Sequence, residues 1–368
     1  MAARTLVAAA LCAASAGPAG NLPRYGPEPG SSLRKTFAEE TRWELESLTV
    51  IADGREYPAP GRFELDVEQR RELVVRDQVA AHAEGRPTRL LRRYESLAGA
   101  SRVRSAEAGS EEEIARADWQ SALEGARVAF TWDAAEGRHR AAYDPALPEA
   151  SEETEEAEEE RDPALLAGLV EDLDLRCLLP PPELAEGDGW TVDAAALRPL
   201  LQPGGGLGLL PREEQLAGDA HALLSTRAWS AFGFAPGPAA VVRGTARARL
   251  GEAVEEGGRR LAAVELELEL TAERDLQAAA RELAAALGLE DALDPAEVSG
   301  RFSLEGEGRL LWDLEAGRLH SFELRGETRL DVTQIERWGD PGTGGQRGRE
   351  SRIRMAGTTL LTARAGAP

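Results

Sequence analysis

Apolar and charged residues alternate along the chain from Arg42 onward. In the stretch RWELESLTVI, one face carries Trp43, Leu45, Thr49 and Ile51, and the other carries Arg42, Glu44 and Glu46. The stretch RFELDVE alternates in the same way through Phe63, Leu65 and Val67. A period of two residues is typical of a strand with one buried side and one solvated side. The pattern therefore predicts long amphipathic strands.

Turn residues separate these strands into hairpins. Glu84-Gly85-Arg86-Pro87 predicts one turn in the first half. In the second half, the segment from Val241 to Leu270 predicts a hairpin with its turn at 255–258, and residues 301–338 predict a second, longer hairpin. A last strand is predicted over 350–365.

Two segments have helical rather than strand periodicity. Asp162 and Pro163 form a helix start, and Leu166, Leu169, Val170 and Leu173 follow at helical spacing. The segment Ala272–Leu287 predicts an amphipathic helix that ends at Gly288. A shorter helical piece is expected over 194–201, whereas residues 200–239 fit no element.

These elements predict an α+β fold that is mostly antiparallel β. We expect one or more long-stranded, curved sheets in two similar halves, each with one packed helix. The N-terminal half spans 31–150 and the C-terminal half spans 239–368. Between them lie an acidic linker, 151–162, and a connector with helix and irregular structure, 163–238.

A Trp-Asp motif occurs once in each half. Trp132-Asp133 is followed by Gly137, and Trp312-Asp313 is followed by Gly317. Aspartate often begins a tight turn because its carboxylate accepts backbone N–H groups, and glycine tolerates a positive φ. Tryptophan before the turn offers a large apolar face to the end of the sheet. We therefore interpret these six residues as two structural hairpin turns and as a sign of internal duplication.

The same residues have a chemical alternative. Asp133 and Asp313, together with Glu136, would be the carboxylates of a hydrolase if the two turns converged in one cleft. Turn chemistry already explains the aspartates, so we favour the structural interpretation.

Charge excludes some partners. The 368 residues include 43 basic and 65 acidic ones, giving a net charge of -22. Such a surface repels nucleic acid and anionic membrane surfaces. The run SEETEEAEEERD predicts a solvated linker. A calcium loop is the alternative, but the run lacks the glycine turn and alternating ligands of such loops.

The N-terminus predicts export. Arg4 precedes an apolar run from Leu6 to Ala14, and Ala14-Ser15-Ala16 offers a cleavage site after Ala16. A flexible tether over 17–30 would follow; a buried first helix is the alternative. Leu11 is too bulky to precede a lipoprotein cysteine, so Cys12 is expected to be lost and Cys177 to remain unpaired. No later apolar run is long enough to span a bilayer.

Groupings that carry catalysis are scarce in the sequence. The four histidines have no metal-site spacing, and His82 and His139 lie beside turns where surface histidines are ordinary. No Gly-x-Ser-x-Gly motif is present. Cys177 is expected to be a buried, inert thiol, and PGGGLG a flexible loop. We therefore predict no catalytic, cofactor-binding or metal-binding residues.

The phrases LLPPPELAEGDGW and EGEGRLLWDLEAGRL resemble uncharacterised exported bacterial β-rich proteins with duplicated halves. The long antiparallel strands, two helices and export signal are also distantly similar to lipoprotein-carrier-like envelope proteins. That resemblance implies an open curved sheet with an apolar interior for lipid tails. The first hypothesis is an exported, non-catalytic envelope protein of the periplasm that binds a lipid-like ligand or a protein partner. A purely structural or assembly module is the alternative, and an acid-residue hydrolase is the third hypothesis.

Overall fold

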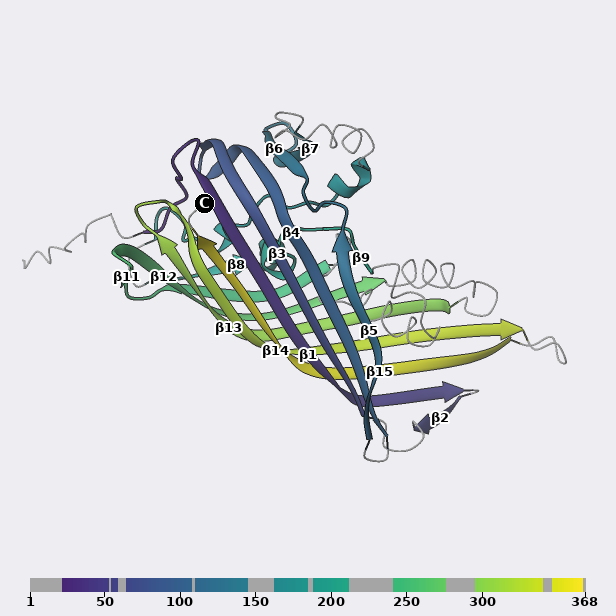
Figure 1. Ribbon diagram of the computed structural model, residues 1–368. Helices are drawn as coiled ribbons and strands as arrows, with labels where there is room; N and C mark the ends of the chain where they lie inside the picture. Colours follow the sequence, from purple (N-terminus) through teal and green to yellow (C-terminus); the bar gives the residue numbers. More distant parts are fainter. Residues whose placement is uncertain are drawn as a thin grey trace, which may run out of the picture.

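One open, strongly curved sheet dominates the molecule (Figure 1). The computed structural model describes residues 22–52, 54–58, 64–107, 110–144, 162–184, 188–211, 241–275, 295–339 and 346–366. Within these residues the sheet has 15 strands, and every pairing between them is antiparallel. The prediction of a mostly antiparallel, curved β protein is confirmed.

The strands fall into three groups along the chain. The first group is β1 (Ser32–Ala52), β2 (Arg55–Pro58), β3 (Glu64–Ala83), β4 (Arg86–Glu107), β5 (Ser110–Ser121), β6 (Arg127–Asp133) and β7 (Arg138–Tyr143). The connector contributes β8 (Gly189–Asp193) and β9 (Leu209–Pro211). The last group is β10 (Val241–Leu250), β11 (Val254–Glu256), β12 (Arg259–Asp275), β13 (Pro295–Asp313), β14 (Arg318–Gly339) and β15 (Gln346–Gly366).

The first and last strands, β1 and β15, lie side by side in the middle of the sheet. The main strand order is β7-β6-β4-β3-β1-β15-β14-β13-β12-β10-β8, so β1 pairs with β15. This pairing joins the strands of the two predicted halves into one continuous sheet. Residues 22–30, which fall in the predicted tether, also pack against it: Tyr25 is buried, and the Gly26 N–H donates to the Gly317 carbonyl at 3.0 Å.

The helix predicted from Pro163 is wrong beyond its first turn. Asp162 caps a 3-10 turn, η1 (Pro163–Leu166), by accepting from the Ala164 N–H at 2.8 Å. Gly168 then adopts a φ of 86°, which ends any helix, and Leu169 forms a β-bridge with Gly205. The connector also holds η2 (Arg176–Leu178), η3 (Ala194–Leu197) and α2 (Arg198–Leu201).

The second predicted helix is also wrong at its start. Residues 272–275 belong to β12, where they pair in register with residues 299–302 of β13. The remainder, 276–287, lies outside the described residues. Across the described part of the chain, no helix combines the length and apolar character that crossing a membrane requires.

The alternation of the strands gives the sheet an apolar inner face and a charged outer face. Phe37, Trp43, Leu304, Phe322 and Met355 are buried on the inner face and belong to one hydrophobic core. The described connector residues add Leu173, Leu175, Leu178, Leu197, Leu200, Leu201 and Leu207 to the same core. The connector therefore packs on part of the inner face, and the outer face remains polar.

Glycines allow neighbouring strands to approach closely where the sheet curves. Gly306 of β13 and Gly326 of β14 lie directly opposite each other near the middle of their strands. A Cβ on Gly306 would lie 2.5 Å from the Arg325 carbonyl oxygen, and one on Gly326 would lie 2.5 Å from Leu304 Cδ1. Only glycine fits such positions, and glycine kinks of this kind let a sheet curve.

Candidate functional site

Both Trp-Asp motifs lie in four-residue turns, one between β6 and β7 and the other between β13 and β14. Asp133 Oδ1 accepts from the Ala135 and Glu136 N–H groups at 2.9 and 3.2 Å. Asp313 Oδ1 makes the same contacts with the N–H groups of Glu315 and Ala316, at 3.1 and 2.9 Å. Gly137 and Gly317 take φ values of 63° and 60°.

Each aspartate has its own arginine partner. Asp133 forms an ion pair with Arg140, and Asp313 lies 3.5 Å from Arg259. The strand order places β4, β3, β1 and β15 between the two hairpins. The Glu136 N–H holds the pKa of Asp133 below its usual value, whereas a general acid needs a raised pKa. The geometry therefore does not join the two aspartates as an acid–base pair.

The two tryptophans attach their turns to other segments. Trp312 is buried, and its Nε1–H donates to the Arg24 carbonyl at 3.2 Å. Trp132 is covered by the Arg86 guanidinium, 4.1 Å from the ring centroid, and meets the His139 ring edge-on at 5.1 Å. The six motif residues thus lie at the ends of two hairpins.

A network of buried charges fastens the connector to the inner face of the sheet. The chain's only lysine, Lys35 on β1, is 2% exposed. Its Nζ lies 3.0 Å from Asp77 on β3 and 2.9 Å from Asp174 in the connector. Burial lowers the pKa of Lys35, but the two carboxylates outweigh burial and raise it above its usual value. The lysine therefore stays charged and cannot act as a nucleophile.

Arg92 on β4 extends this network. It donates from Nε and Nη2 to the two oxygens of Asp77, at 2.7 and 2.9 Å. It also donates to the backbone carbonyls of Val170 and Glu171 in the connector, at 2.9 and 2.7 Å. Burial raises the pKa of Asp77, but Arg92 and Lys35 outweigh burial and lower it. A bidentate Arg–Asp pair of this kind fixes geometry as well as charge.

The connector has a second cluster beside the first. Arg176 donates from Nε to Asp172 at 3.0 Å and pairs with Glu171. Its guanidinium also lies 5.1 Å from the centroid of the Tyr25 ring. Asp174 Oδ1 and the Tyr25 hydroxyl are buried and have no hydrogen-bond partner among the described residues. Because the charges are mutually compensated, we assign these two clusters a structural role.

Cys177 fits neither a metal site nor a nucleophile. Burial raises the pKa of its thiol, which disfavours the reactive thiolate. Within the described residues, no three His, Cys, Asp or Glu side chains are grouped so as to hold a metal ion.

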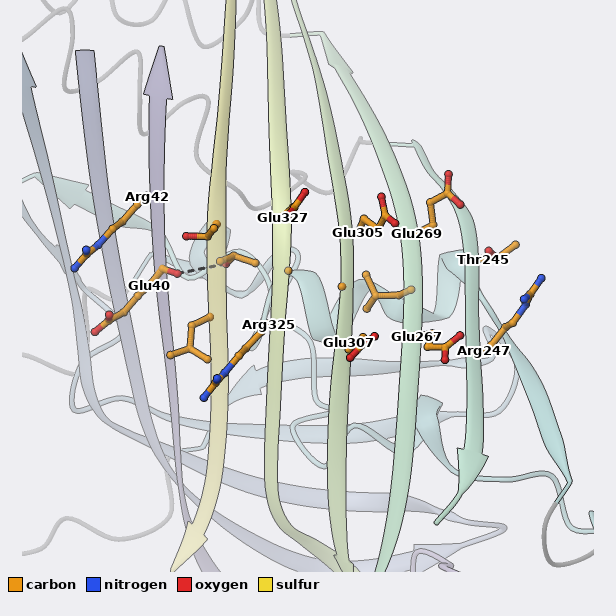
Figure 2. Close-up of a pocket in the computed structure, with 16 residues that line it drawn as sticks. Glu40, Arg42, Thr245, Arg247, Glu267, Glu269, Glu305, Glu307, Arg325 and Glu327 are labelled. Carbon is orange, nitrogen blue, oxygen red and sulfur yellow. Dashed lines mark hydrogen bonds between the residues drawn. The ribbon is translucent and has the colours of Figure 1, made fainter. Parts of the chain in front are cut away.

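The outer face has a hollow over β10, β12, β13, β14, β15 and β1 (Figure 2). Its volume is about 960 Å³, and its lining includes six glutamates and three arginines. The glutamates are Glu40, Glu267, Glu269, Glu305, Glu307 and Glu327, and the arginines are Arg42, Arg247 and Arg325. The backbone of the facing pair Gly306 and Gly326 forms part of the floor of the hollow. Their close approach, described above, lies on the other side of the sheet.

Three glutamates lie directly opposite one another in this hollow. Glu305 on β13 pairs in register with Glu269 on β12 and with Glu327 on β14. Figure 2 shows the three carboxylates side by side. All three are exposed, and no ion pair reaches them from the rest of the described chain. We call Glu269, Glu305 and Glu327 the glutamate row.

Two of the three arginines of the hollow face other partners. Arg42 lies 3.6 Å from Glu68 on β3, and Arg325 lies 2.9 Å from Glu323 on its own strand. In Figure 2 the side chains of Arg42 and Arg325 point away from the glutamate row. The row is thus a site of uncompensated negative charge on a backbone that is fixed by sheet hydrogen bonds.

No protein-family model matches the chain, and no curated protein matches it. The solved structures that match it include two from a Salmonella secretion system. One is described as the atomic model of the Salmonella SPI-1 type III secretion injectisome basal body proteins InvG, PrgH and PrgK, with 8% identity, a TM-score of 0.15, and coverage of 92% of this chain and 46% of that chain. The other is the InvG secretin domain β-barrel from the Salmonella SPI-1 injectisome, with 8% identity, a TM-score of 0.14, and coverage of 92% and 62%.

The chain thus spans less than two thirds of the length of both structures. TM-scores this low carry no argument about fold or function. The similarity to lipoprotein-carrier-like envelope proteins therefore stays a prediction from the sequence.

Proposed function

We propose that this chain is an exported, non-catalytic protein of the cell envelope that docks a cationic segment of a partner protein on its outer sheet face. The observation that carries the proposal is the glutamate row, three carboxylates in direct cross-strand register without a compensating ion pair among the described residues. Export rests on the predicted signal peptide with cleavage after Ala16.

The glutamate row should lower the stability of the sheet, and folding alone does not explain why it is there. Like charges directly opposite each other on neighbouring strands are destabilising by a few tenths of a kcal/mol up to about 1 kcal/mol. Elsewhere on the same face, Arg249 pairs with Glu265 and Arg354 pairs with Asp331 across strands. A cationic partner would offset the repulsion within the row, and complementary charges also guide association.

The shape of the outer face suits an extended segment. A second hollow, of about 990 Å³, lies further along the same strands and is lined by Ser299, Arg301, Asp331 and Thr333 among others. Both hollows are open and charged, so a polypeptide would be held by side-chain and solvent contacts rather than by apolar burial.

An apolar ligand has weaker support. The inner-face side chains, such as Trp43 and Leu304, are buried in the core, and the connector packs on the same face. The two hollows described above are open to solvent and lined by many charged side chains, which suits a lipid tail poorly. We therefore favour a protein partner, and with it an assembly role, over lipid carriage.

A photo-reactive amino acid tests the proposal in intact cells. Thr358 lines the hollow, whereas Thr362, four residues further along β15 and on the same face, does not. With the probe at position 358, we expect cross-links to one protein through a segment rich in arginine or lysine. Replacing all three residues of the glutamate row by glutamine should remove these cross-links.

The probe at position 362 is the matched control and should give few protein cross-links. Equal labelling from the two positions would show that the hollow is not a docking site. Cross-links to lipid alone from position 358 would favour the apolar-ligand hypothesis instead.

A further inference from the structure

The outer face of the sheet has an uncharged strip along β15, the middle strand of the main order. The outward residues of β15 between 356 and 362 are Ala356, Thr358, Leu360 and Thr362. At the same levels, every outward residue of β14 is charged, and so is every one of β1 except Ala38. We call these four residues of β15 the seam, because charge lies on both sides of them.

The glutamate row continues across the seam as arginines. Glu327 lies opposite Thr358 of the seam, and Thr358 lies opposite Arg42 on β1. Figure 2 shows Glu327 and Arg42 on opposite sides of β15. Two strands beyond Arg42, the same row reaches Arg102 on β4. One strand from the seam, Glu327 is therefore matched by Arg42, and three strands from it Glu269 is matched by Arg102.

The three neighbouring rows of the outer face repeat this relation. At equal distances from the seam, counted in strands, the register matches Arg325 with Glu40, Glu307 with Arg70, Arg247 with Asp118, Arg329 with Glu44, Arg243 with Glu113, and Arg309 with Glu72. Each match sets a base on one side of the seam against an acid on the other. In these four rows, which consist of described residues, the one like-charged match is Glu305 with Glu68, and Glu68 already has Arg70 at 2.9 Å.

Each side of the seam also has a hollow. The hollow described above covers the side of the glutamate row. A smaller one, of about 410 Å³, lies over β1, β3 and β4, and its lining includes Arg42, Arg70, Arg102 and Arg104. Long charged side chains from a facing surface therefore find a recess of opposite charge on either side.

We propose that the outer face binds a second copy of this chain, face to face, about a two-fold axis that runs along β15. The inference rests on the proposed docking role of this face and names its partner. In a two-fold interface every contact between two residues occurs twice, with the copies exchanged. An axis along β15 lays the arginine side of each copy over the glutamate side of the other. A residue on the axis meets its own equivalent, so a charge there would repel itself, and the seam carries none.

The dimer compensates the glutamate row. Arg42 of each copy faces Glu327 of the other, and Arg102 faces Glu269, so these two matches give four ion pairs. Like charges that meet across an interface are costly, so the pattern also disfavours other orientations of the two copies.

The net charge of -22 opposes association at long range. At physiological ionic strength the Debye length is about 8 Å, so distant charges are largely screened from one another whereas pairs in contact are not. A single exposed ion pair contributes little, so the interface depends on several matches at once.

Analytical ultracentrifugation of the full chain at physiological ionic strength tests the dimer. The wild type should form dimers that dissociate on dilution. The acidic variant, Arg42→Glu with Arg102→Glu, and the basic variant, Glu269→Arg with Glu327→Arg, should each dimerise at least about tenfold more weakly, because four ion pairs become four repulsions. An equimolar mixture of the two variants should recover the dimer, because each glutamate then faces an arginine.

A matched control separates register from overall charge. Glu28→Arg with Glu252→Arg changes the net charge as the basic variant does, at exposed positions outside the four rows. Followed by fluorescence, the labelled acidic variant should bind this control at least about fivefold more weakly than it binds the basic variant. Circular dichroism checks that every variant is folded. Equal binding of the two, or a wild type that stays monomeric, would overturn the proposal.

The photo-reactive probe at position 358 distinguishes this inference from the docking function. Thr358 lies on the proposed axis, so the probe should join two copies of the chain. Cross-links to a different protein, from a chain that sediments as a monomer, would overturn the dimer and leave the docking function in place.

Discussion

The ammonium of Lys35 lies 2.9 Å from the carboxylate of Asp174, and this ion pair joins the first strand of the sheet to the connector. Both groups are buried, and Asp77 and Arg92 complete the network around them. Removing one charge from such a network leaves an uncompensated ion in the interior.

We expect Lys35→Met to lower the free energy of unfolding by about 3–5 kcal/mol, because Asp174 loses its charge partner in a site that water does not reach. Denaturant titration measures the loss. Hydrogen exchange over residues 170–178 should become faster, since this part of the connector is held by the network.

The double variant Lys35→Met, Asp174→Leu is the control for that prediction. It leaves Asp77 paired with Arg92 and no unpaired charge at position 174. It should be more stable than Lys35→Met by about 1–3 kcal/mol, so that the two substitutions are not additive, as is usual for residues in contact. Additive effects of the two substitutions would contradict the assigned network.

Acid should loosen the connector. Burial raises the pKa of Asp77 and Asp172, but Arg92 and Arg176 outweigh it and hold both pKa values below the ordinary 3.8. Their contribution to stability is present above the unfolded-state pKa and is lost as pH falls through the folded-state values. Connector exchange measured by hydrogen–deuterium labelling, corrected for the pH dependence of the intrinsic exchange rate, should therefore stay slow at pH 5 and accelerate only below about pH 4. Acceleration already at pH 5 would be inconsistent with lowered pKa values.

A methyl group at the close approach of β13 and β14 should disturb the sheet. In Gly326→Ala the new Cβ would lie 2.5 Å from Leu304 Cδ1 and 2.8 Å from the Glu305 carbonyl oxygen. We expect a loss of about 1–3 kcal/mol in thermal or denaturant unfolding, as for other overpacked sites. Gly26→Ala is the matched control, because a Cβ there meets nothing within 4 Å. Equal stability of the two variants would argue against the close approach.

Neutralising the middle of the glutamate row should stabilise the protein. Glu305 lies opposite both Glu269 and Glu327, so Glu305→Gln relieves two repulsive contacts and should raise the free energy of unfolding by about 0.2–1 kcal/mol for each. Glu323→Gln, which instead loses an ion pair with Arg325, should bring no gain. Differential scanning calorimetry at low salt resolves the two cases, and a loss of stability in Glu305→Gln would show that the row is compensated.

The strand pattern was predictable because alternation depends only on local sequence. Trp43 and Leu45 lie on the inner face of β1, and the Glu84-Gly85 turn separates β3 from β4. The pairing of β1 with β15 was not predictable, because it depends on contacts between residues far apart in the chain. The leucines after Pro163 misled the helix prediction, since Gly168 and the bridge at Leu169 override their spacing.

The charge network left a signal that sequence reasoning missed. Lys35 lies on the buried face of its strand, with buried Leu33 and Phe37 two residues to either side. Arg92 is flanked in the same way by Leu90 and Tyr94. A charged residue among the buried positions of a strand indicates a buried partner of opposite charge. The glutamate row left no such signal, because each glutamate occupies an ordinary outer position and only the register between strands brings the three together.

The most direct test of the docking proposal is a calorimetric titration with an extended peptide of about ten residues that carries arginine at every second position, so that one side faces the sheet. At physiological salt, replacing Glu269, Glu305 and Glu327 by glutamine should weaken binding by on the order of tenfold, or about 1.4 kcal/mol. Replacing the exposed Glu28, Glu252 and Glu255 changes the net charge equally and should leave the affinity within roughly twofold of the wild type. Equal weakening by the two triple variants would show that overall charge, and not the hollow, attracts the peptide.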